Sequence, residues 1–266
     1  MTTNRQVSIA FSGSGFLAPI HAGAAAAVLD AGCEIVEAAG TSGGSIVAAA
    51  VGLGMNSAQL KSLGMNTSFK GLTSPDFFGI IDNMALSSGH ALLELLQSLF
   101  PNKTMKDAQM PLQIVSTHVE AGASYIFAPD TDADTQISLA CRASASVPFL
   151  YAPVKYRGMT LVDGGVINNI PVDRLQSKSS IKIGIDVAEG SSYSASNAFK
   201  FASSLIGMLL SANENSHEAL GQMTGAHILA VPTNDWFLNT DLTEGQRAQL
   251  FQAGYDHVSQ FLHSQS

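Results

Sequence analysis

The chain has 266 residues, of which 46% are hydrophobic and 13% charged, and its formal net charge is −8. This composition is that of a folded chain with one large core, and it excludes an intrinsically disordered protein. Because the chain is acidic and has no Lys/Arg run, it lacks the positive field that nucleic-acid binding needs, and we expect no nucleic-acid partner.

Short β-rich runs alternate with helical stretches along most of the chain. Such alternation predicts an α/β fold of three layers, with helices on both faces of a mostly parallel central sheet. The predicted strands are Val7–Phe11, Glu34–Ala38, Leu112–Val119, Tyr125–Ala128, Thr160–Val162, Ile181–Val187 and His227–Val231. The predicted helices are Pro19–Ala31, Ser45–Leu53, Ile137–Ala145, Ala195–Ala219 and Thr243–His263.

The stretch from about residue 56 to 111 interrupts this alternation. Its apolar residues recur at helical spacing, and they include Phe77, Phe78 and the group Leu92–Phe100. The pattern predicts a helical insertion, which either packs on the sheet or forms a lid that contacts an apolar ligand. In both cases we expect a single domain over residues 1–266.

The first glycine turn has the layout of a dinucleotide-binding loop. Gly13-x-Gly15-x-x-Ala18 follows an apolar strand and precedes an alanine-rich helix, and Glu37 stands near the place of the acidic residue that binds a ribose. The same loop could instead hold another oxyanion with its backbone amides. The sequence that follows Glu37 favours this second interpretation.

A second glycine turn, Gly40-Thr-Ser42-Gly-Gly44, lies between a predicted strand and a predicted helix. This is the G-x-S-x-G nucleophile elbow, in which a sharp turn lifts a serine clear of the sheet. The glycines permit a backbone that is too tight for a Cβ, and the free N–H groups of the helix favour a developing anion. The alternative is that Ser42 only caps the helix.

A nucleophilic serine needs a base, and no histidine is well placed to be one. His257 and His263 lie in the amphipathic terminal helix, where a solvated face explains them. Asp163 ends an apolar strand and is followed by Gly164 and Gly165. Its carboxylate is either a buried base that points across a cleft or part of an Asp-Gly hairpin turn.

Taken together, these motifs resemble the patatin-like phospholipase family. The glycine-rich loop Ser12–Gly15, the elbow and the D-G-G run occur in the family's order, and Arg142–Pro148 and Asp163–Pro171 are similar to its R-A-[ST]-x-[AS]-x-P and D-G-G-x-x-x-N-x-P blocks. The resemblance covers roughly residues 7 to 185. The chain departs from the family loop, usually G-G-G-x-[RK]-G, at three positions: Ser14, Leu17 and Ala18.

The resemblance implies a Ser42–Asp163 dyad without histidine, in which the amides around Gly13, Ser14 and Gly15 form the oxyanion hole. It implies hydrolysis of a lipid acyl ester, such as a phospholipid, lysophospholipid or acylglycerol, through an acyl-enzyme, with no metal and no cofactor. Transient contact with a membrane surface fits this substrate. An acyltransferase that uses the same dyad, a non-catalytic lipid- or protein-binding module and a nucleotide-binding protein remain alternatives.

Four residues near these motifs are expected to have structural roles. His21 packs inside the first helix or bonds the nearby backbone, Asn168 and Asn169 fix the turn after Asp163, and Arg142 anchors its region through a carboxylate or carbonyl groups.

The remaining features concern cellular context. The N-terminus lacks the apolar core of a signal peptide, and no apolar run reaches the ~18 residues of a membrane span. We therefore expect a cytoplasmic protein without a transmembrane segment, and export by a route independent of such a signal stays open. Cys33 and Cys141 lie in apolar contexts far apart, which predicts two buried thiols.

Overall fold

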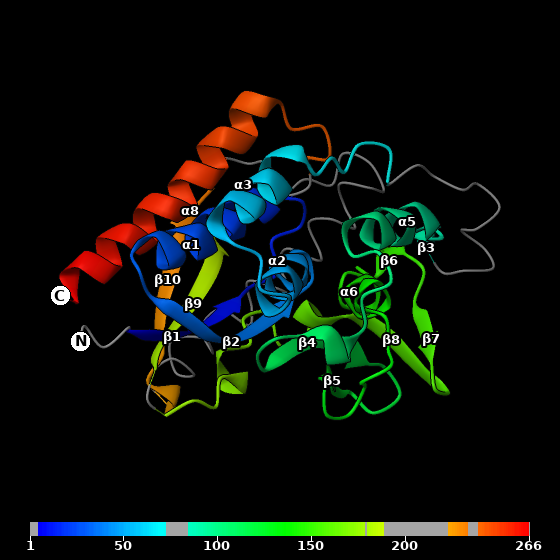
Figure 1. Ribbon diagram of the computed structural model, residues 1–266. Coiled ribbons are helices and arrows are strands. Elements are labelled where there is room, and N and C mark those ends of the chain that lie inside the picture. Colours follow the sequence, from blue (N-terminus) through cyan, green and yellow to red (C-terminus); the bar gives the residue numbers. More distant parts are fainter. Residues whose placement is uncertain (1–4, 73–84, 179, 189–222, 234–238, 266) are drawn as a thin grey trace.

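A mostly parallel sheet forms the middle of the protein (Figure 1). The structure, a computed structural model, describes residues 5–72, 85–178, 180–188, 223–233 and 239–265. In these residues the sheet has eight strands, in the order β10-β9-β1-β2-β4-β8-β7 with β5 paired to β4. The strands from β10 to β4 are parallel, whereas β5, β7 and β8 pair antiparallel. The strands are β1 (Gln6–Phe11), β2 (Glu34–Thr41), β4 (Leu112–His118), β5 (Ala123–Phe127), β7 (Val154–Tyr156), β8 (Met159–Asp163), β9 (Ile181–Ala188), β10 (His227–Pro232) and, in a separate pair, β3 (Ala85–Ser87) and β6 (Phe149–Tyr151).

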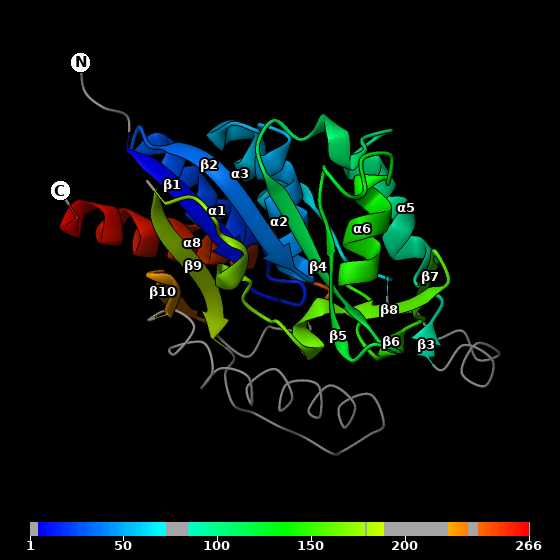
Figure 2. The ribbon, with the colours of Figure 1, turned by 90° about the horizontal axis from the view of Figure 1, so that it is seen from below.

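The described helices cover one face of this sheet, as the two views in Figures 1 and 2 show. The described helices are α1 (Ala18–Asp30), α2 (Gly43–Gly52), α3 (Ser57–Asn66), α5 (His90–Leu99), α6 (Ile137–Ser144) and α8 (Glu244–Ser264), with 3-10 turns η1 (Met105–Asp107), η2 (Gly164–Val166) and η3 (Val172–Arg174). The terminal helix α8 lies along α1. None of the helices in the described ranges is both long and apolar enough to cross a bilayer.

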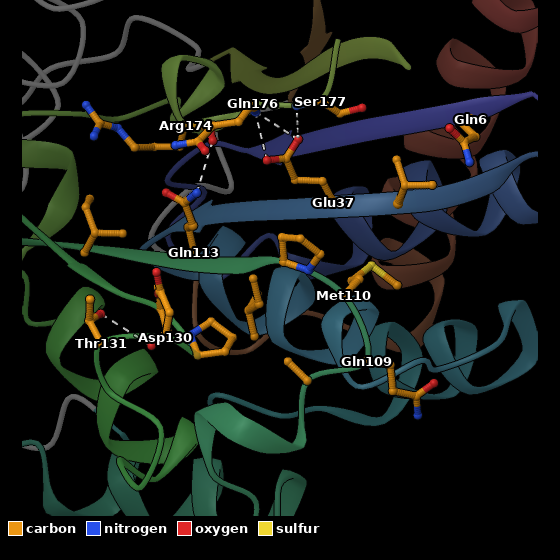
Figure 3. A pocket seen from close by; sticks show the side chains of 17 residues that line it. Gln6, Glu37, Gln109, Met110, Gln113, Asp130, Thr131, Arg174, Gln176 and Ser177 are labelled. Atoms are coloured by element: carbon orange, nitrogen blue, oxygen red, sulfur yellow. Dashed lines mark hydrogen bonds between the residues drawn. The ribbon is translucent and has the colours of Figure 1, made fainter. Parts of the chain in front are cut away.

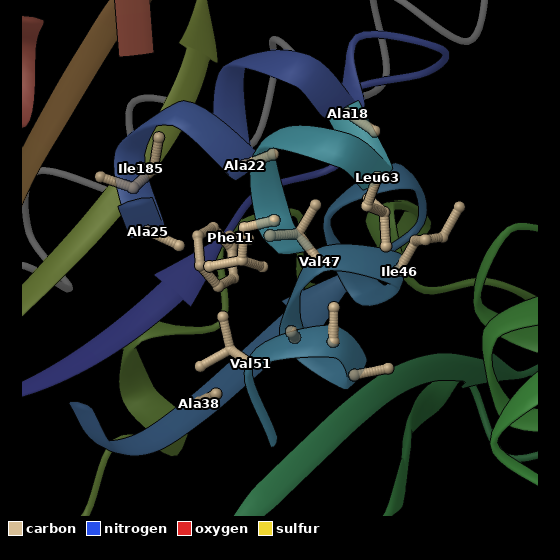
Figure 4. Close-up of a cluster of buried hydrophobic side chains, with 14 of the residues drawn as sticks. Phe11, Ala18, Ala22, Ala25, Ala38, Ile46, Val47, Val51, Leu63 and Ile185 are labelled. Atoms are coloured by element: carbon tan, nitrogen blue, oxygen red, sulfur yellow. The ribbon is translucent and has the colours of Figure 1, made fainter. Parts of the chain in front are cut away.

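The main core lies between this helical layer and the sheet (Figure 4). Phe11 and Ile185 point from neighbouring strands toward Val47 and Val51 of α2 and the alanines of α1. Small side chains let the helices approach closely: a Cβ on Gly23 of α1 would lie 1.9 Å from the carbonyl oxygen of Phe251 in α8. A smaller core on the opposite face contains Ala10, Ala39, Ile170, Val172 and Leu175.

The sequence predicted the long elements and missed the short ones. The mixed α/β class with a mostly parallel sheet is confirmed, and the predicted strands and helices within the described residues are present with ends shifted by a few residues. The three-residue strands β3, β6 and β7 were not predicted, because so short a run has no measurable periodicity. The predicted helix Ala195–Ala219 lies outside the described residues.

In its described residues, the stretch from residue 56 to 111 contains the helices α3 and α5. Leu92, Leu96 and Phe100 are buried in the main core, so this part packs against the domain. Phe77 and Phe78 lie outside the described residues. Cys33 and Cys141 are buried free thiols, as predicted, and burial raises the pKa of Cys141 to about 12.

Candidate active site

The ends of β2 and β8 pair with adjacent residues of β4, and this pairing brings the side chains of Ser42 and Asp163 together. The parallel pairing of β2 with β4 ends at Thr41, which lies opposite Val115. The antiparallel pairing of β8 with β4 ends at Asp163, opposite the next residue, Ser116. A Cβ on Gly164 would lie 2.2 Å from the carbonyl oxygen of Val115 and 3.1 Å from Cγ2 of Thr41, so the two strand ends are in contact. The register of the sheet therefore places Ser42 beside Asp163.

Ser42 occupies the sharp turn that the sequence predicted. Its φ of 51° and ψ of −124° put it in the left-handed half of backbone space, where a residue with a Cβ is strained. It immediately precedes α2, and its own side chain makes no capping hydrogen bond. The interpretation of Ser42 as a simple helix cap is therefore wrong, and the turn has the geometry of a nucleophile elbow.

The flanking glycines let the elbow pack tightly. A Cβ on Gly40 would lie 2.6 Å from the carbonyl oxygen of Gly44, and one on Gly44 would lie 2.3 Å from that of Ser12. Real Cβ atoms do not approach backbone oxygens so closely, so both positions require glycine. The first turn of α2 can thus rest directly on the end of β1.

Asp163 is a buried carboxyl with an elevated pKa. Its side chain is 4% exposed, and burial raises its pKa to about 6, against the smaller lowering effects of the Ser42 hydroxyl and the Gly165 amide. The Gly165 amide donates to Oδ1 at 2.8 Å, which makes Asp163 the cap of η2 rather than a residue of a hairpin turn. Oδ2 is buried and has no hydrogen-bond partner among the described residues.

Oδ2 is therefore free to accept a further hydrogen bond. The hydroxyl lies close enough to lower the pKa of the carboxyl. Catalytic contacts in free enzymes are commonly long and tighten when substrate binds. At neutral pH a carboxyl with a pKa of about 6 is mostly ionised, and it is a stronger base than an ordinary aspartate.

The first glycine loop lies against the elbow. A Cβ on Gly13 would be 3.5 Å from Cβ of Ser42 and 2.4 Å from Oδ1 of Asn169. The backbone N–H of Gly13 donates to the carbonyl oxygen of Asn169 at 3.0 Å, so this amide is not available to an oxyanion in the structure. Asn169 thus joins the predicted loop to the segment after Asp163, whereas Asn168 accepts a hydrogen bond from Thr41 through its carbonyl oxygen.

Three other amides near the elbow lack an acceptor. Among the described residues, no acceptor is assigned to the backbone N–H of Ser14, Gly15 or Gly43. Gly43 was not predicted, although the amide after the nucleophile is a common donor and its place in G-x-S-x-G could have pointed to it. Leu17, at the position where the family has a basic residue, is fully buried in the apolar core.

Replacing Gly43 by alanine is expected to lower kcat by about 10²–10³-fold, the cost of one lost oxyanion donor. The new Cβ would lie 2.4 Å from the carbonyl oxygen of Gly15 and 2.6 Å from Oγ of Ser14, so the loop must move away from the elbow. The measurement is steady-state hydrolysis of a fatty-acyl ester. The control is Gly245→Ala in α8, where a Cβ meets nothing within 4 Å; it should leave kcat unchanged. Wild-type kcat in Gly43→Ala would remove Gly43 from the oxyanion hole.

Arg142 holds the segment that supports Asp163. Its buried guanidinium has no acidic partner among the described residues and donates to the carbonyl oxygens of Gly89, Ser88 and Ala152, as the carbonyl alternative predicted. It also donates to the hydroxyl of Ser146, whose backbone oxygen accepts from the Asp163 amide at 2.9 Å. Burial lowers the pKa of Arg142 to about 10, which keeps it charged at neutral pH.

His21 has a structural role and is not a base for Ser42. Its Nε2 donates to the carbonyl oxygen of Ser12 at 2.9 Å, and its ring packs edge-on against Phe11. Complete burial lowers its pKa to about 4, an effect that the Ser12 hydrogen bond only partly opposes. The imidazole therefore stays neutral at physiological pH.

This burial predicts a pH-dependent loss of stability. Because the pKa of His21 is lower in the folded state than its ordinary 6.5, the unfolded state binds more protons between pH 6.5 and 4. The free energy of unfolding should thus fall by up to about 3 kcal/mol as pH drops through this window. Urea unfolding at several pH values measures the fall, which should be smaller in His21→Gln. An NMR titration of His21 with a midpoint near 6.5 would contradict the prediction.

Glu37, the acidic residue of the apparent dinucleotide motif, uses its carboxylate in hydrogen bonds within the protein. Its carboxylate accepts hydrogen bonds from the amides of Gln176 and Ser177 (Figure 3). It also accepts a hydrogen bond from the hydroxyl of Ser8. It lines a groove of about 990 Å³ that includes neither Ser42 nor Asp163. Glu37 pairs with Ser8, which lies four residues, or roughly 13 Å, before Ser12 along β1. The loop and the acid therefore do not form one nucleotide site.

Comparisons with known proteins find related sequences. The chain is 26% identical over 282 residues to the uncharacterised protein YqhO of Bacillus subtilis, with 95% of this chain and 96% of that protein covered. It is 30% identical over 169 residues to an uncharacterised NTE family protein of Mycobacterium tuberculosis, covering 64% of this chain but only 28% of that protein.

The fold is also similar to solved structures. VipD from Legionella pneumophila superimposes with a TM-score of 0.60 at 14% identity, over 98% of this chain and 67% of that chain. The family model for patatin-like phospholipases matches residues 9–175, the part of the chain that holds the loop, the elbow and the D-G-G run. The chain therefore belongs to the patatin-like phospholipase family.

Proposed function

We propose that this protein hydrolyses carboxylic esters of lipids through a Ser42–Asp163 dyad and an acyl-enzyme. The observation that carries the proposal is the strained elbow serine beside a buried carboxyl whose pKa is raised to about 6 and whose Oδ2 has no partner among the described residues. A serine hydroxyl and an adjacent base are the minimum that nucleophilic acyl transfer requires.

In the proposed acylation, Oδ2 of Asp163 accepts the hydroxyl proton while Oγ of Ser42 attacks the ester carbonyl carbon. The tetrahedral intermediate then collapses, the alcohol leaves with the proton from Asp163, and the acyl group stays on Ser42. A water molecule, deprotonated by Asp163, attacks the acyl-enzyme in the same way and releases the fatty acid. The low polarity that raises the pKa of Asp163 also strengthens its interaction with Ser42.

The negatively charged oxygen of the tetrahedral intermediate needs hydrogen-bond donors, and we place them on the side of the glycine loop. The amides of Ser14, Gly15 and Gly43 have no acceptor among the described residues and border the elbow, which supports them as the oxyanion hole. Gly43 is the first residue of α2, so its amide also carries the favourable field of a helix N-terminus.

Membership of the patatin-like phospholipase family supports phospholipids, lysophospholipids or acylglycerols as the substrate class. Exposed apolar side chains support transient contact with a lipid surface. Phe149 is 62% exposed although its φ of 66° is unfavourable for a bulky residue, and Ile167, in the segment after Asp163, is 38% exposed.

The test is a panel of lipid esters, presented both as vesicles and as soluble short-chain esters, with fatty acid release measured by mass spectrometry. We expect release from at least one class, faster from vesicles, and none with Ser42→Ala. Transfer of the acyl group to an added lysolipid or alcohol without free fatty acid would instead identify an acyltransferase. Absence of any acyl release or transfer would contradict the proposed function.

A further inference from the structure

We propose that Ser144 is a positioning residue that holds the backbone of Ser42 in its strained conformation. The inference rests on the proposed function, because it assigns Ser144 a part in orienting the nucleophile. It concerns a hydroxyl whose hydrogen bonds in the described residues go to Ser42 and Val115 and not to Asp163 or the oxyanion loop. Its evidence is a pair of hydrogen bonds at the end of α6.

Ser42 needs such a support because its backbone conformation is unfavourable by itself. A non-glycine residue with φ near +51° persists only where its surroundings leave it no alternative. The pairing of β2 with β4 stops at Thr41, so the peptide group that follows cannot rely on the regular ladder. Its N–H must find another acceptor or remain unpaired in the interior.

Ser144 supplies that acceptor. The amide of Ser42 donates to Oγ of Ser144 at 2.8 Å, and the same hydroxyl donates to the carbonyl oxygen of Val115 at 2.5 Å. Ser144 is fully buried at the last residue of α6, so water cannot replace it. Val115 is the β4 partner of Thr41. The Ser144 hydroxyl thus links β4 to Ser42, the first residue after β2, through a single oxygen atom.

The other side of Ser42 is held separately. The carbonyl oxygen of Ser42 accepts from the amide of Ser45 at 3.0 Å and from its hydroxyl at 2.5 Å. Removing the Ser144 hydroxyl would therefore remove the support of the Ser42 N–H and leave the bonds to its carbonyl oxygen in place. The φ angle of Ser42 could then shift, which would turn its Oγ away from Asp163. The same α6 terminus fixes Asp163 through the backbone oxygen of Ser146, so one short segment sets both halves of the dyad.

The test compares Ser144→Thr with Ser144→Val, because these side chains have the same shape and differ in the hydroxyl. A displacement of about 1 Å can cost a catalytic site around 10²-fold. We expect Ser144→Val to show kcat and fluorophosphonate labelling of Ser42 lower than Ser144→Thr by about 10- to 100-fold, with KM within about twofold. Ser8→Ala, which removes a buried hydroxyl that bonds Glu37 instead, controls for general destabilisation.

Equal rates in the Val and Thr variants would overturn the proposal, as would an equal loss in Ser8→Ala. Amide hydrogen exchange gives an independent readout: the Ser42 amide should exchange faster in Ser144→Val than in Ser144→Thr, and equal protection would also overturn it. This readout does not need activity. If the wild type neither cleaves an ester nor labels at Ser42, the proposed function fails, while exchange still decides whether Ser144 holds Ser42.

Discussion

Replacing Ser42 by alanine is expected to lower kcat for lipid-ester hydrolysis by about 10⁶-fold, the usual cost of removing a serine nucleophile. Alanine keeps the backbone bonds of the elbow to Ser144 and Ser45, so the fold should persist. The hydroxyl now lowers the pKa of Asp163, and its loss should raise that pKa further. The measurement is fatty acid release under substrate saturation, alongside circular dichroism.

The matched control for this variant is Ser98→Ala. Ser98 is an exposed serine of α5, and among the described residues its hydroxyl bonds the carbonyl oxygen of Leu95 in the same helix. It should retain wild-type kcat. Retained turnover in Ser42→Ala, with Ser98→Ala unchanged, would show that another residue is the nucleophile.

Replacing Asp163 by asparagine is expected to lower kcat by about 10²–10⁴-fold, the range that a positioned general base contributes. Asparagine preserves the shape and can still accept the Gly165 amide, but it cannot take the Ser42 proton. In the wild type, kcat/KM should fall about tenfold per pH unit below a midpoint near pH 6, because only the ionised carboxyl is a base. This acidic limb should disappear in the residual activity of Asp163→Asn.

The same substitution should make the fold more stable at neutral pH. The pKa of Asp163 is raised from 3.8 to about 6, so the folded state binds more protons and the free energy of unfolding falls as pH rises through this window. Above pH 6 the cost reaches up to about 3 kcal/mol, which asparagine avoids. Asp186→Asn is the control, since burial also raises the pKa of Asp186 and its loss should leave the acidic limb in place. An unchanged limb in Asp163→Asn would exclude Asp163 as the base.

The candidate residues Ser42 and Asp163 could be picked out from the sequence because each one is marked by local sequence. Gly40 and Gly44 mark the elbow, and Gly164 marks the strand end at Asp163, since in each case the backbone passes too close to a neighbour for a Cβ. Glycine at fixed spacing reports such constraints within a few residues of the functional side chain. The resemblance to a family then joined the two motifs.

The supporting residues could not be predicted because no local sequence feature marks them. The hydrogen bond from Ser42 to Ser144 joins residues 102 positions apart. A serine at a helix end does not indicate which backbone amide will donate to it. The engagement of the Gly13 amide by Asn169 likewise depends on how the segment after Asp163 folds back over the loop. Such contacts follow from tertiary packing, whereas periodicity and turn motifs report only local structure.

The short elements were missed because their signals are weak. The turn between β7 and β8 has Arg157 and Gly158 with φ of 49° and 81°, a conformation for which Asn-Gly is the usual marker. Because the first of these positions is an arginine, the sequence does not mark the hairpin. The β7–β8 hairpin nevertheless brings β8 to β4 in the register that ends at Asp163.

Covalent labelling with a fluorophosphonate, followed by peptide mass spectrometry, tests the dyad most directly. The expected result is a single adduct on Ser42, whose rate of formation rises with pH through a midpoint near 6 and drops by at least about 100-fold in Asp163→Asn. An adduct on a different residue, or labelling of Ser42 at an unchanged rate in Asp163→Asn, would contradict the assignment of Ser42 as nucleophile with Asp163 as its base.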